Sequence, residues 1–111
     1  MILFVLRLAL PQEKRIDAIN TIKSIVEPTR VLPGCQYCKL YCDVENDDQL
    51  VFLEEWRSQE DLERHIRSDD FRIILAVMDL GSEPPIPDFH TVSSTDGMEL
   101  IEKIRGRNHK D

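Results

Sequence analysis

Large apolar side chains alternate with other residues at the start of the chain. They occupy every second position, at Ile2, Phe4, Leu6, Leu8 and Leu10, and the positions between them are only partly apolar. This period of two predicts a central strand over residues 1–10, buried on one face and partly covered on the other. The run lacks the basic start and cleavage site of a signal peptide and is too short to cross a membrane.

Two later regions repeat apolar residues every three or four positions, which is typical of helices. The first begins at Pro11 and is predicted to run to about Glu27, because Pro28 ends it. The second lies between residues 58 and 81. Ser58 with Asp61 resembles a capping box, and a second helix start follows at residue 68, so this region is either one kinked helix or two.

Three more strands follow from alternation and turn residues. Residues 35–44 and 50–56 flank a polar loop, which predicts an antiparallel hairpin. The proline-rich segment 83–87 leads into a short strand over 88–93, and its prolines suit either a sheet edge or the first residues of a strand. Residues 96–105 predict a C-terminal helix, with a frayed tail from Gly106 onward.

The predicted order is βαββαβ with one added helix. This is the order of an α+β, ferredoxin-like fold, in which an antiparallel four-stranded sheet carries both helices on one face. We assign residues 1–96 to this domain and 97–111 to a C-terminal helix and tail. Because the helices cover only one face, apolar side chains on the other face need a second copy of the chain, and we predict a homodimer.

Composition and charge narrow the functional classes. The chain has 111 residues, of which 41% are hydrophobic and 32% charged, as in a single globular domain. Its formal net charge of −7 argues against nucleic acid or an anionic membrane as a partner, because such surfaces are bound through basic groups. Three cysteines without an export signal predict reduced thiols in a cytoplasmic protein.

The cysteines Cys35, Cys38 and Cys42 are candidates for a metal site. A structural zinc site usually takes four ligands, and the spacing offers no fourth ligand nearby. Strand alternation also places Cys35 on the face opposite the other two. We therefore predict buried reduced thiols and no metal, with a redox role for Cys35 as the alternative.

The segment from Pro33-Gly34-Cys35 through Glu54-x-Trp56 to His65 and 68–71 resembles the antibiotic biosynthesis monooxygenase family over roughly residues 1–94. Glu54-x-Trp56 followed by His65 is its most specific part. The resemblance implies a dimeric α+β barrel with a cavity in each subunit between sheet and helices. It also implies oxidation of a quinol or polyphenol by molecular oxygen without metal or flavin cofactor.

Haem-degrading members of the family carry Asn, Trp and His at the positions that match Leu6, His65 and Leu75 here. These three differences argue against haem breakdown. Members without a demonstrated activity also exist, so the family alone does not fix the reaction.

His65 and Trp56 are the candidate catalytic residues. An imidazole can serve as a general base near neutral pH, and His65 shares a helix face with Leu62 and Ile66 that is expected to face the cavity; the alternative is a structural histidine bonded to a neighbour. Trp56 can stack on a planar substrate and donate its N–H to a phenolate, or it is simply part of the core.

Four further residues are candidates for substrate binding. Glu54 is either a weak base or a hydrogen-bonding anchor of the sheet. Arg7 is the best candidate for holding an anionic oxygen, unless it pairs with an acidic neighbour. His90 follows Asp88 by two residues, which predicts either acid–base work or a surface pair. Phe71 is placed in the substrate pocket.

Two functional hypotheses result. The chain is either a cofactor-independent monooxygenase acting on a small aromatic substrate and oxygen, or a non-catalytic dimeric module that binds a small ligand or partner. The first predicts oxygen uptake that is lost in His65→Ala or Trp56→Phe. The second predicts that an aromatic ligand raises the melting temperature while no product forms.

Overall fold

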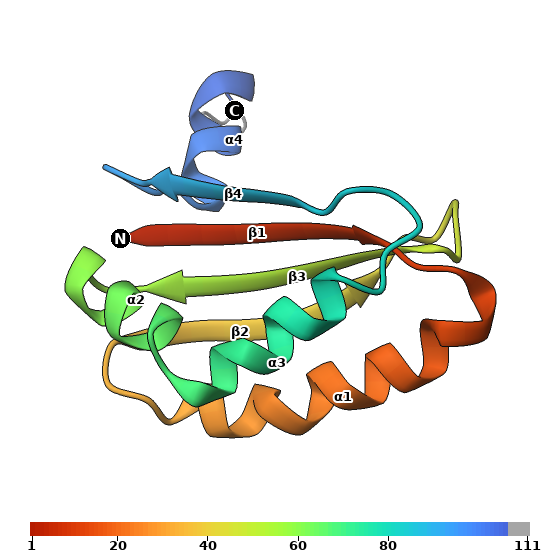
Figure 1. The fold of residues 1–111 in the computed structure, drawn as a ribbon. Coiled ribbons are helices and arrows are strands. Elements are labelled where there is room, and N and C mark those ends of the chain that lie inside the picture. The colour runs from red at the N-terminus through yellow and green to blue at the C-terminus, as the bar shows by residue number, and fades with distance from the viewer. Residues whose placement is uncertain (107–111) are drawn as a thin grey trace.

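The computed structural model describes residues 1–106 and confirms the predicted order of elements (Figure 1). The elements are β1 (Ile2–Ala9), α1 (Gln12–Arg30), β2 (Cys35–Cys42), β3 (Gln49–Trp56), α2 (Gln59–Ile66), α3 (Asp69–Met78), β4 (Ile86–Thr91) and α4 (Met98–Arg105). The region after Ser58 forms two helices rather than one kinked helix. Within residues 1–106, no helix is long and apolar enough to cross a membrane.

The four strands form one antiparallel sheet in the order β2-β3-β1-β4. Strand β1 is central, and its Phe4 lies opposite Glu54 of β3 and Phe89 of β4. Helices α1, α2 and α3 cover one face of the sheet, as Figure 1 shows. Strands β2 and β4 are the two edges, so the predicted edge position of β4 is confirmed, although it begins at Ile86 rather than Asp88.

The alternation of apolar residues along β1 explains where the core lies. The even-numbered side chains Phe4, Leu6 and Leu8 are almost completely buried, and they face helices α1 and α3. The opposite face carries Arg7, which is exposed. A smaller cluster of Ile2, Trp56 and Leu62 lies where β3 meets α2, and this is the end of the sheet that holds the candidate site.

The prediction that Pro28 ends α1 is wrong, because the helix continues to Arg30. Proline removes one backbone N–H, and so close to the helix end it breaks a single intrahelical bond. Contacts outside the helix hold the last turn. Thr29 is fully buried, and the guanidinium of Arg30 donates to the carbonyl oxygen of Cys38 at 3.0 Å.

Strand β2 also departs from simple alternation. Cys35 lies opposite Trp56 and Cys38 lies opposite Glu54, so three residues on β2 span the distance of two on β3. This bulge turns Cys35 to the same face as Cys38, and the prediction of opposite faces is wrong. The strand ends at Cys42, before the exposed Val44.

The cysteines differ in burial, and only Cys38 is fully buried. Burial raises the pKa of the Cys35 and Cys38 thiols, which keeps both as neutral thiols at physiological pH. Cys42 is exposed, so the prediction of buried thiols is wrong for this residue. Residues 1–106 contain no group of three or more side chains arranged to hold a metal ion.

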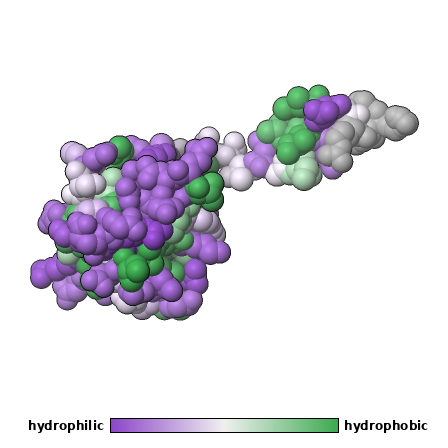
Figure 2. Space-filling model, turned by 90° about the vertical axis from the view of Figure 1, so that its right-hand side faces the viewer, coloured by the Kyte–Doolittle hydropathy of each residue, from purple (hydrophilic) through white to green (hydrophobic). Residues whose placement is uncertain are grey.

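The C-terminal helix α4 is connected to β4 by an extended segment and stands away from the body of the molecule (Figure 2). Gly106 follows it in the left-handed conformation, with φ of 70°, as is usual at a helix end. The fraying predicted beyond Gly106 falls on residues 107–111, which lie outside the described residues.

Candidate functional site

A fully buried carboxylate, that of Glu54, joins the two candidate catalytic residues. One of its oxygens accepts a hydrogen bond from Trp56 Nε1 at 2.9 Å, and the other lies 2.9 Å from His65 Nε2. Glu54 and Trp56 come from one face of β3, and His65 comes from α2. A buried charge must be matched by hydrogen-bond donors, and here the indole and imidazole N–H groups supply them.

This arrangement fixes the tautomer of His65. A carboxylate can only accept hydrogen bonds, so the Nε2 atom that faces Glu54 carries a proton. In the neutral ring the other nitrogen, Nδ1, then has a free lone pair. Nδ1 is buried and has no hydrogen-bond partner within residues 1–106. A free acceptor in a fixed orientation is what a general base requires.

Aromatic contacts hold the imidazole ring in place. The ring of Trp56 stacks on His65 with a centroid distance of 4.8 Å, and Phe71 of α3 approaches it edge-on at 5.4 Å. His65 therefore contacts β3 and α3 at once. Phe71, predicted to bind substrate, touches the histidine and is not among the residues that line the cavity beside it.

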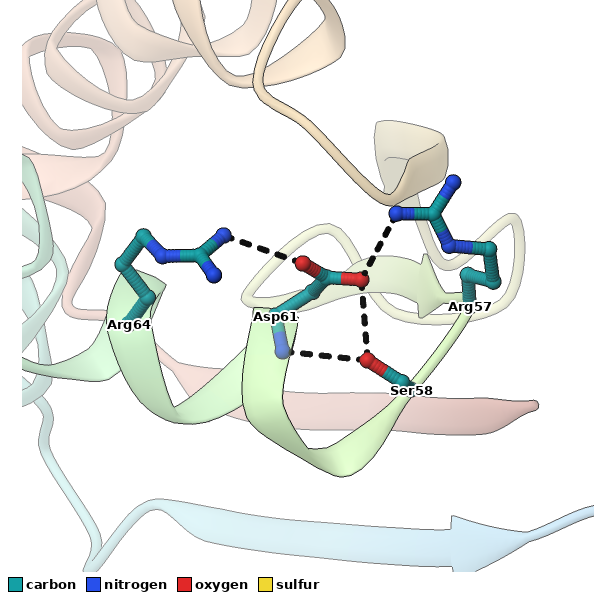
Figure 3. Close-up of polar contacts among 4 residues, drawn as sticks. All are labelled: Arg57, Ser58, Asp61 and Arg64. Carbon is teal, nitrogen blue, oxygen red and sulfur yellow. Dashed lines mark hydrogen bonds and ion pairs between the residues drawn. The ribbon is translucent and has the colours of Figure 1, made fainter.

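The start of α2 decides where His65 points. Ser58 Oγ accepts from the backbone N–H of Asp61 at 3.2 Å and donates to its carboxylate at 2.9 Å (Figure 3). The capping pair predicted from the sequence is thus present. His65 lies four residues after Asp61, about one helical turn, so the cap sets the register that directs the imidazole toward Glu54.

Two arginines flank Asp61. Arg64 donates to one carboxylate oxygen at 2.9 Å and Arg57 to the other at 3.2 Å, from opposite sides (Figure 3). The hydrogen bond from Ser58 lowers the pKa of Asp61, and the two guanidinium groups lower it further. One carboxylate shared by two cations leaves this cluster with one net positive charge.

Gly34 lets the turn before β2 approach this cluster. Its φ is +84°, and a Cβ atom there would lie only 2.2 Å from the Asp61 carboxylate oxygen. The Gly34 carbonyl oxygen also accepts the backbone N–H of Arg57 at 2.8 Å. Only glycine meets both conditions, because it tolerates a positive φ and has no side chain to collide.

A cavity of about 220 Å³ lies beside His65. It is lined by Leu32, Pro33, Trp56, Asp61, Arg64, His65 and Ser68. An apolar cavity of about 150 Å³ is known to accept benzene, so this one has room for a single substituted ring. The Arg64 side chain is 62% exposed, which places the cation at the outer rim.

Two candidate binding residues lie elsewhere. Arg7 is on the face of the sheet opposite the helices, where its guanidinium pairs with Asp88 at 3.0 Å. The alternative of an acidic neighbour is therefore the one that holds for Arg7. The predicted surface pair between His90 and Asp88 is wrong, because Asp88 pairs across the strands with Arg7 and leaves His90 exposed on the edge strand.

The helix face assigned to His65 needs one further correction. Leu62 is buried beside His65 as predicted, but Ile66 is 37% exposed and lines a different apolar hollow with Phe71 and Leu75. One residue is 100° around a helix, so a neighbour of the buried histidine falls on the margin of the buried face.

Arg64 is the site residue that the sequence interpretation missed, together with Leu32 and Pro33. Its spacing of three residues from Asp61 is a signal of an ion pair on one helix face. Arg64 also directly precedes His65 in the sequence, which is a second signal that it lies near the site. For Leu32 and Pro33 there was no comparable signal, since a loop before β2 reaches the site only through the fold.

Comparisons with known proteins agree with the fold. Residues 1–76 match the family model described as antibiotic biosynthesis monooxygenase. A conserved protein from Methanosarcina mazei Go1 has a TM-score of 0.75 at 30% identity, over 80% of this chain and 89% of that one. A Mycobacterium tuberculosis protein has a TM-score of 0.78 at 21% identity, over 86% and 98% of the two chains.

An uncharacterised protein from a Synechocystis strain is 30% identical over 59 residues, which is 53% of this chain. The match covers only 40% of that longer relative. The structural similarity at low identity concerns the fold, and the family match ends at residue 76, before β4 and α4.

Proposed function

We propose, from the premise that the chain belongs to the antibiotic biosynthesis monooxygenase family, that it oxidises a small aromatic substrate with molecular oxygen and without a cofactor. A quinol or polyphenol is the substrate class. The observation that carries this proposal is the buried, unpartnered Nδ1 of His65, in a ring held by Glu54 and stacked on Trp56 beside an apolar cavity.

The chemistry begins with proton transfer. His65 Nδ1 takes the proton of a phenolic O–H, and the Glu54 carboxylate stabilises the imidazolium that forms. The phenolate is electron-rich enough to pass one electron to oxygen, which gives a phenoxyl radical and superoxide. The two combine at a ring carbon that carries hydrogen, and the imidazolium of His65 returns its proton to the resulting peroxide. Loss of water, which takes the hydrogen of that carbon, then leaves a quinone. One oxygen atom ends in the quinone and the other in water.

The cavity wall provides the remaining functions. Trp56 offers a flat surface for the substrate ring, and its N–H is already committed to Glu54, so stacking rather than hydrogen bonding is its contribution. Arg64 at the rim offers guanidinium N–H groups to an oxygen anion on the substrate, because Asp61 takes only part of its donor capacity. A phenol with a second oxygen substituent can stack on Trp56 and place that oxygen near Arg64.

Oxygen consumption over a panel of quinols and polyphenols tests the proposal. We expect turnover by the wild type, a loss of about 100-fold or more in kcat for His65→Ala, and a smaller loss for Trp56→Phe. His90→Ala is the matched control, because His90 is exposed on the edge strand, and it should keep wild-type rates.

Isotopic labelling separates monooxygenation from simple oxidation. With labelled oxygen gas, one labelled atom should appear in the quinone. Transfer of both atoms to hydrogen peroxide, or full activity in His65→Ala, would contradict the assigned reaction.

The role of Arg64 is tested by steady-state kinetics. We expect Arg64→Ala to raise KM for oxygen-substituted phenols, whereas Arg57→Ala, which also loses an ion pair with Asp61, should leave KM unchanged.

A second candidate function is that of a binding module without turnover. It is favoured by one observation: the side chains of His65 and Glu54 are both 0% exposed, as in a structural anchor. In that case an aromatic ligand would occupy the cavity and raise the melting temperature without product. Turnover of the same ligand would eliminate this alternative.

A further inference from the structure

Helix α4 is amphipathic but has no buried side chain within the described residues. Its apolar residues Met98, Leu100, Ile101 and Ile104 are 42–74% exposed. They fall on one side of the helix, and Glu99, Glu102 and Lys103 fall on the other. Figure 2 shows the apolar surface of this helix set apart from the body of the molecule.

Such a helix needs a surface to pack on. Isolated helices shorter than about 12–15 residues are marginal in water, and α4 has eight. An apolar stripe stabilises a helix only when it is buried against another element. The sequence of α4 therefore specifies a contact that its own chain does not supply in this structure.

The position of α4 indicates the direction in which that contact lies. The helix follows β4, an edge strand, and projects beyond this edge on the side away from β1 (Figure 1). The other edge strand, β2, has unpaired backbone groups of its own. A second copy placed with its β2 edge beside β4 would receive α4, and twofold symmetry would repeat the contact on the other side.

A groove lies beside the β2 edge. It runs between α1 and β2, has a volume of about 380 Å³ and has an apolar floor that includes Ile19, Val26 and Leu40. Three cations, Lys23, Arg30 and Lys39, line the same groove, together with the exposed Cys42 and with Glu27, which pairs with Arg30 at 2.6 Å and leaves a net charge of two positive units there. The groove thus combines an apolar floor with positive charge at its sides.

We propose that α4 docks in the groove between α1 and β2 of a second copy of this chain, so that two copies exchange their C-terminal helices. The apolar stripe of α4 covers the groove floor, and Glu99 and Glu102 face the cations beside it. Its own groove is excluded, because β2 and β4 are opposite edges of the sheet and α1–α3 cover the face between them.

Sedimentation analysis of the full chain tests the exchange. The wild type should be a dimer, and Ile104→Asp should weaken dimerisation by about 100-fold, because it places a charge on the groove floor. Ile104 is 74% exposed, so the substitution leaves the fold of each chain intact. Lys103→Asp introduces the same side chain on the polar side and should change the dissociation constant by less than about 3-fold. A monomeric wild type, or a dimer unaffected by Ile104→Asp, would overturn the proposal.

Disulfide cross-linking tests whether α4 lies in the groove of the second copy. In Ile101→Cys, mild oxidation should give a covalent dimer that joins residue 101 of one chain to Cys42 of the other, identified by peptide mass spectrometry. Adding Cys42→Ser to this variant should abolish the covalent dimer, and the Lys103→Cys variant should form little covalent dimer. A link within one chain, or a covalent dimer that persists in Cys42→Ser, would place α4 elsewhere and overturn the proposal. Neither experiment depends on the reaction that the cavity carries out.

Discussion

Helices α2 and α4 have the same length of eight residues, yet only one of them is packed into the protein. Both are amphipathic, and both carry acidic residues in the first turn and basic residues in the last. In α2, however, Leu62 and His65 are buried against the sheet, whereas α4 buries nothing within the described residues. Helical periodicity is therefore sufficient to predict both helices but says nothing about where either is packed.

The difference arises from contacts distant in the sequence. Helix α2 begins at the side-chain cap of Ser58 and lies against the turn at Gly34. Its His65 forms a hydrogen bond with Glu54 of β3. Helix α4 follows Gly97, which provides no side-chain cap. Three separate contacts hold α2 in place. Substitutions that remove them one at a time measure how much each contributes to the stability of the fold.

The largest effect is expected from removing the buried carboxylate. Glu54→Leu leaves the N–H groups of Trp56 and His65 buried without an acceptor, and we expect the free energy of unfolding to fall by about 3 kcal/mol. Urea denaturation at fixed protein concentration measures this. Glu55→Leu, on the opposite face of the same strand, is the control and should change stability by less than about 1 kcal/mol. Equal losses in both variants would show that the Glu54 contacts do not hold α2.

A smaller effect is expected from the turn that abuts α2. Gly34→Ala must adopt a positive φ and push its Cβ against Asp61, so we expect a loss of about 2 kcal/mol by denaturation. Gly97→Ala at the start of α4 is the matched substitution. Its Cβ would meet only the flexible end of Glu99, at 3.0 Å, and the loss should stay below about 0.5 kcal/mol. Similar losses would mean that both helix starts are equally constrained.

A third effect depends on pH. The pKa of Asp61 is lowered by Ser58 and the two arginines, and that of Glu99 by the backbone N–H of Gly97. When folding lowers the pKa of a carboxyl, the ionised carboxylate stabilises the folded protein at pH values above the pKa that the group has in the unfolded chain. This stabilisation is lost as the pH falls through the pKa that the group has in the folded protein. Asp61→Asn should therefore lower the melting temperature at pH 7, with the difference shrinking below about pH 4. Glu99→Gln should show a smaller difference at neutral pH, since α4 has no buried side chain within residues 1–106.

The smallest effect is expected on α4 in dilute solution. Below the concentration at which chains associate, Ile101→Ser removes no buried contact and should change the free energy of unfolding by less than about 0.5 kcal/mol. Leu62→Ser in α2 makes a comparable substitution at a buried position and should cost several times more. A large loss for Ile101→Ser in the monomer would mean that α4 packs on its own chain.

The site shows how far local sequence can be interpreted. Alternation of side chains along a strand predicts that Glu54 and Trp56 share one face, and both contact His65. The sequence predicts Arg7 as the cation for an anionic oxygen and gives no role to Arg64, whereas the structure places Arg7 on the far side of the sheet. Alternation distinguishes the two faces of a strand, but it does not say which face the helices will cover.

Sequence by itself determined the elements and their order, because periodicity and caps are local properties, while the family resemblance directed attention to Glu54, Trp56 and His65. Tertiary structure decided the continuation of α1 past Pro28, the bulge at Cys35 and the exposure of α4. Each of these depends on free energy from contacts between distant segments, such as the bond from Arg30 to the Cys38 carbonyl, or on the lack of such contacts. Local preferences of about 1 kcal/mol are readily outweighed by packing of that kind.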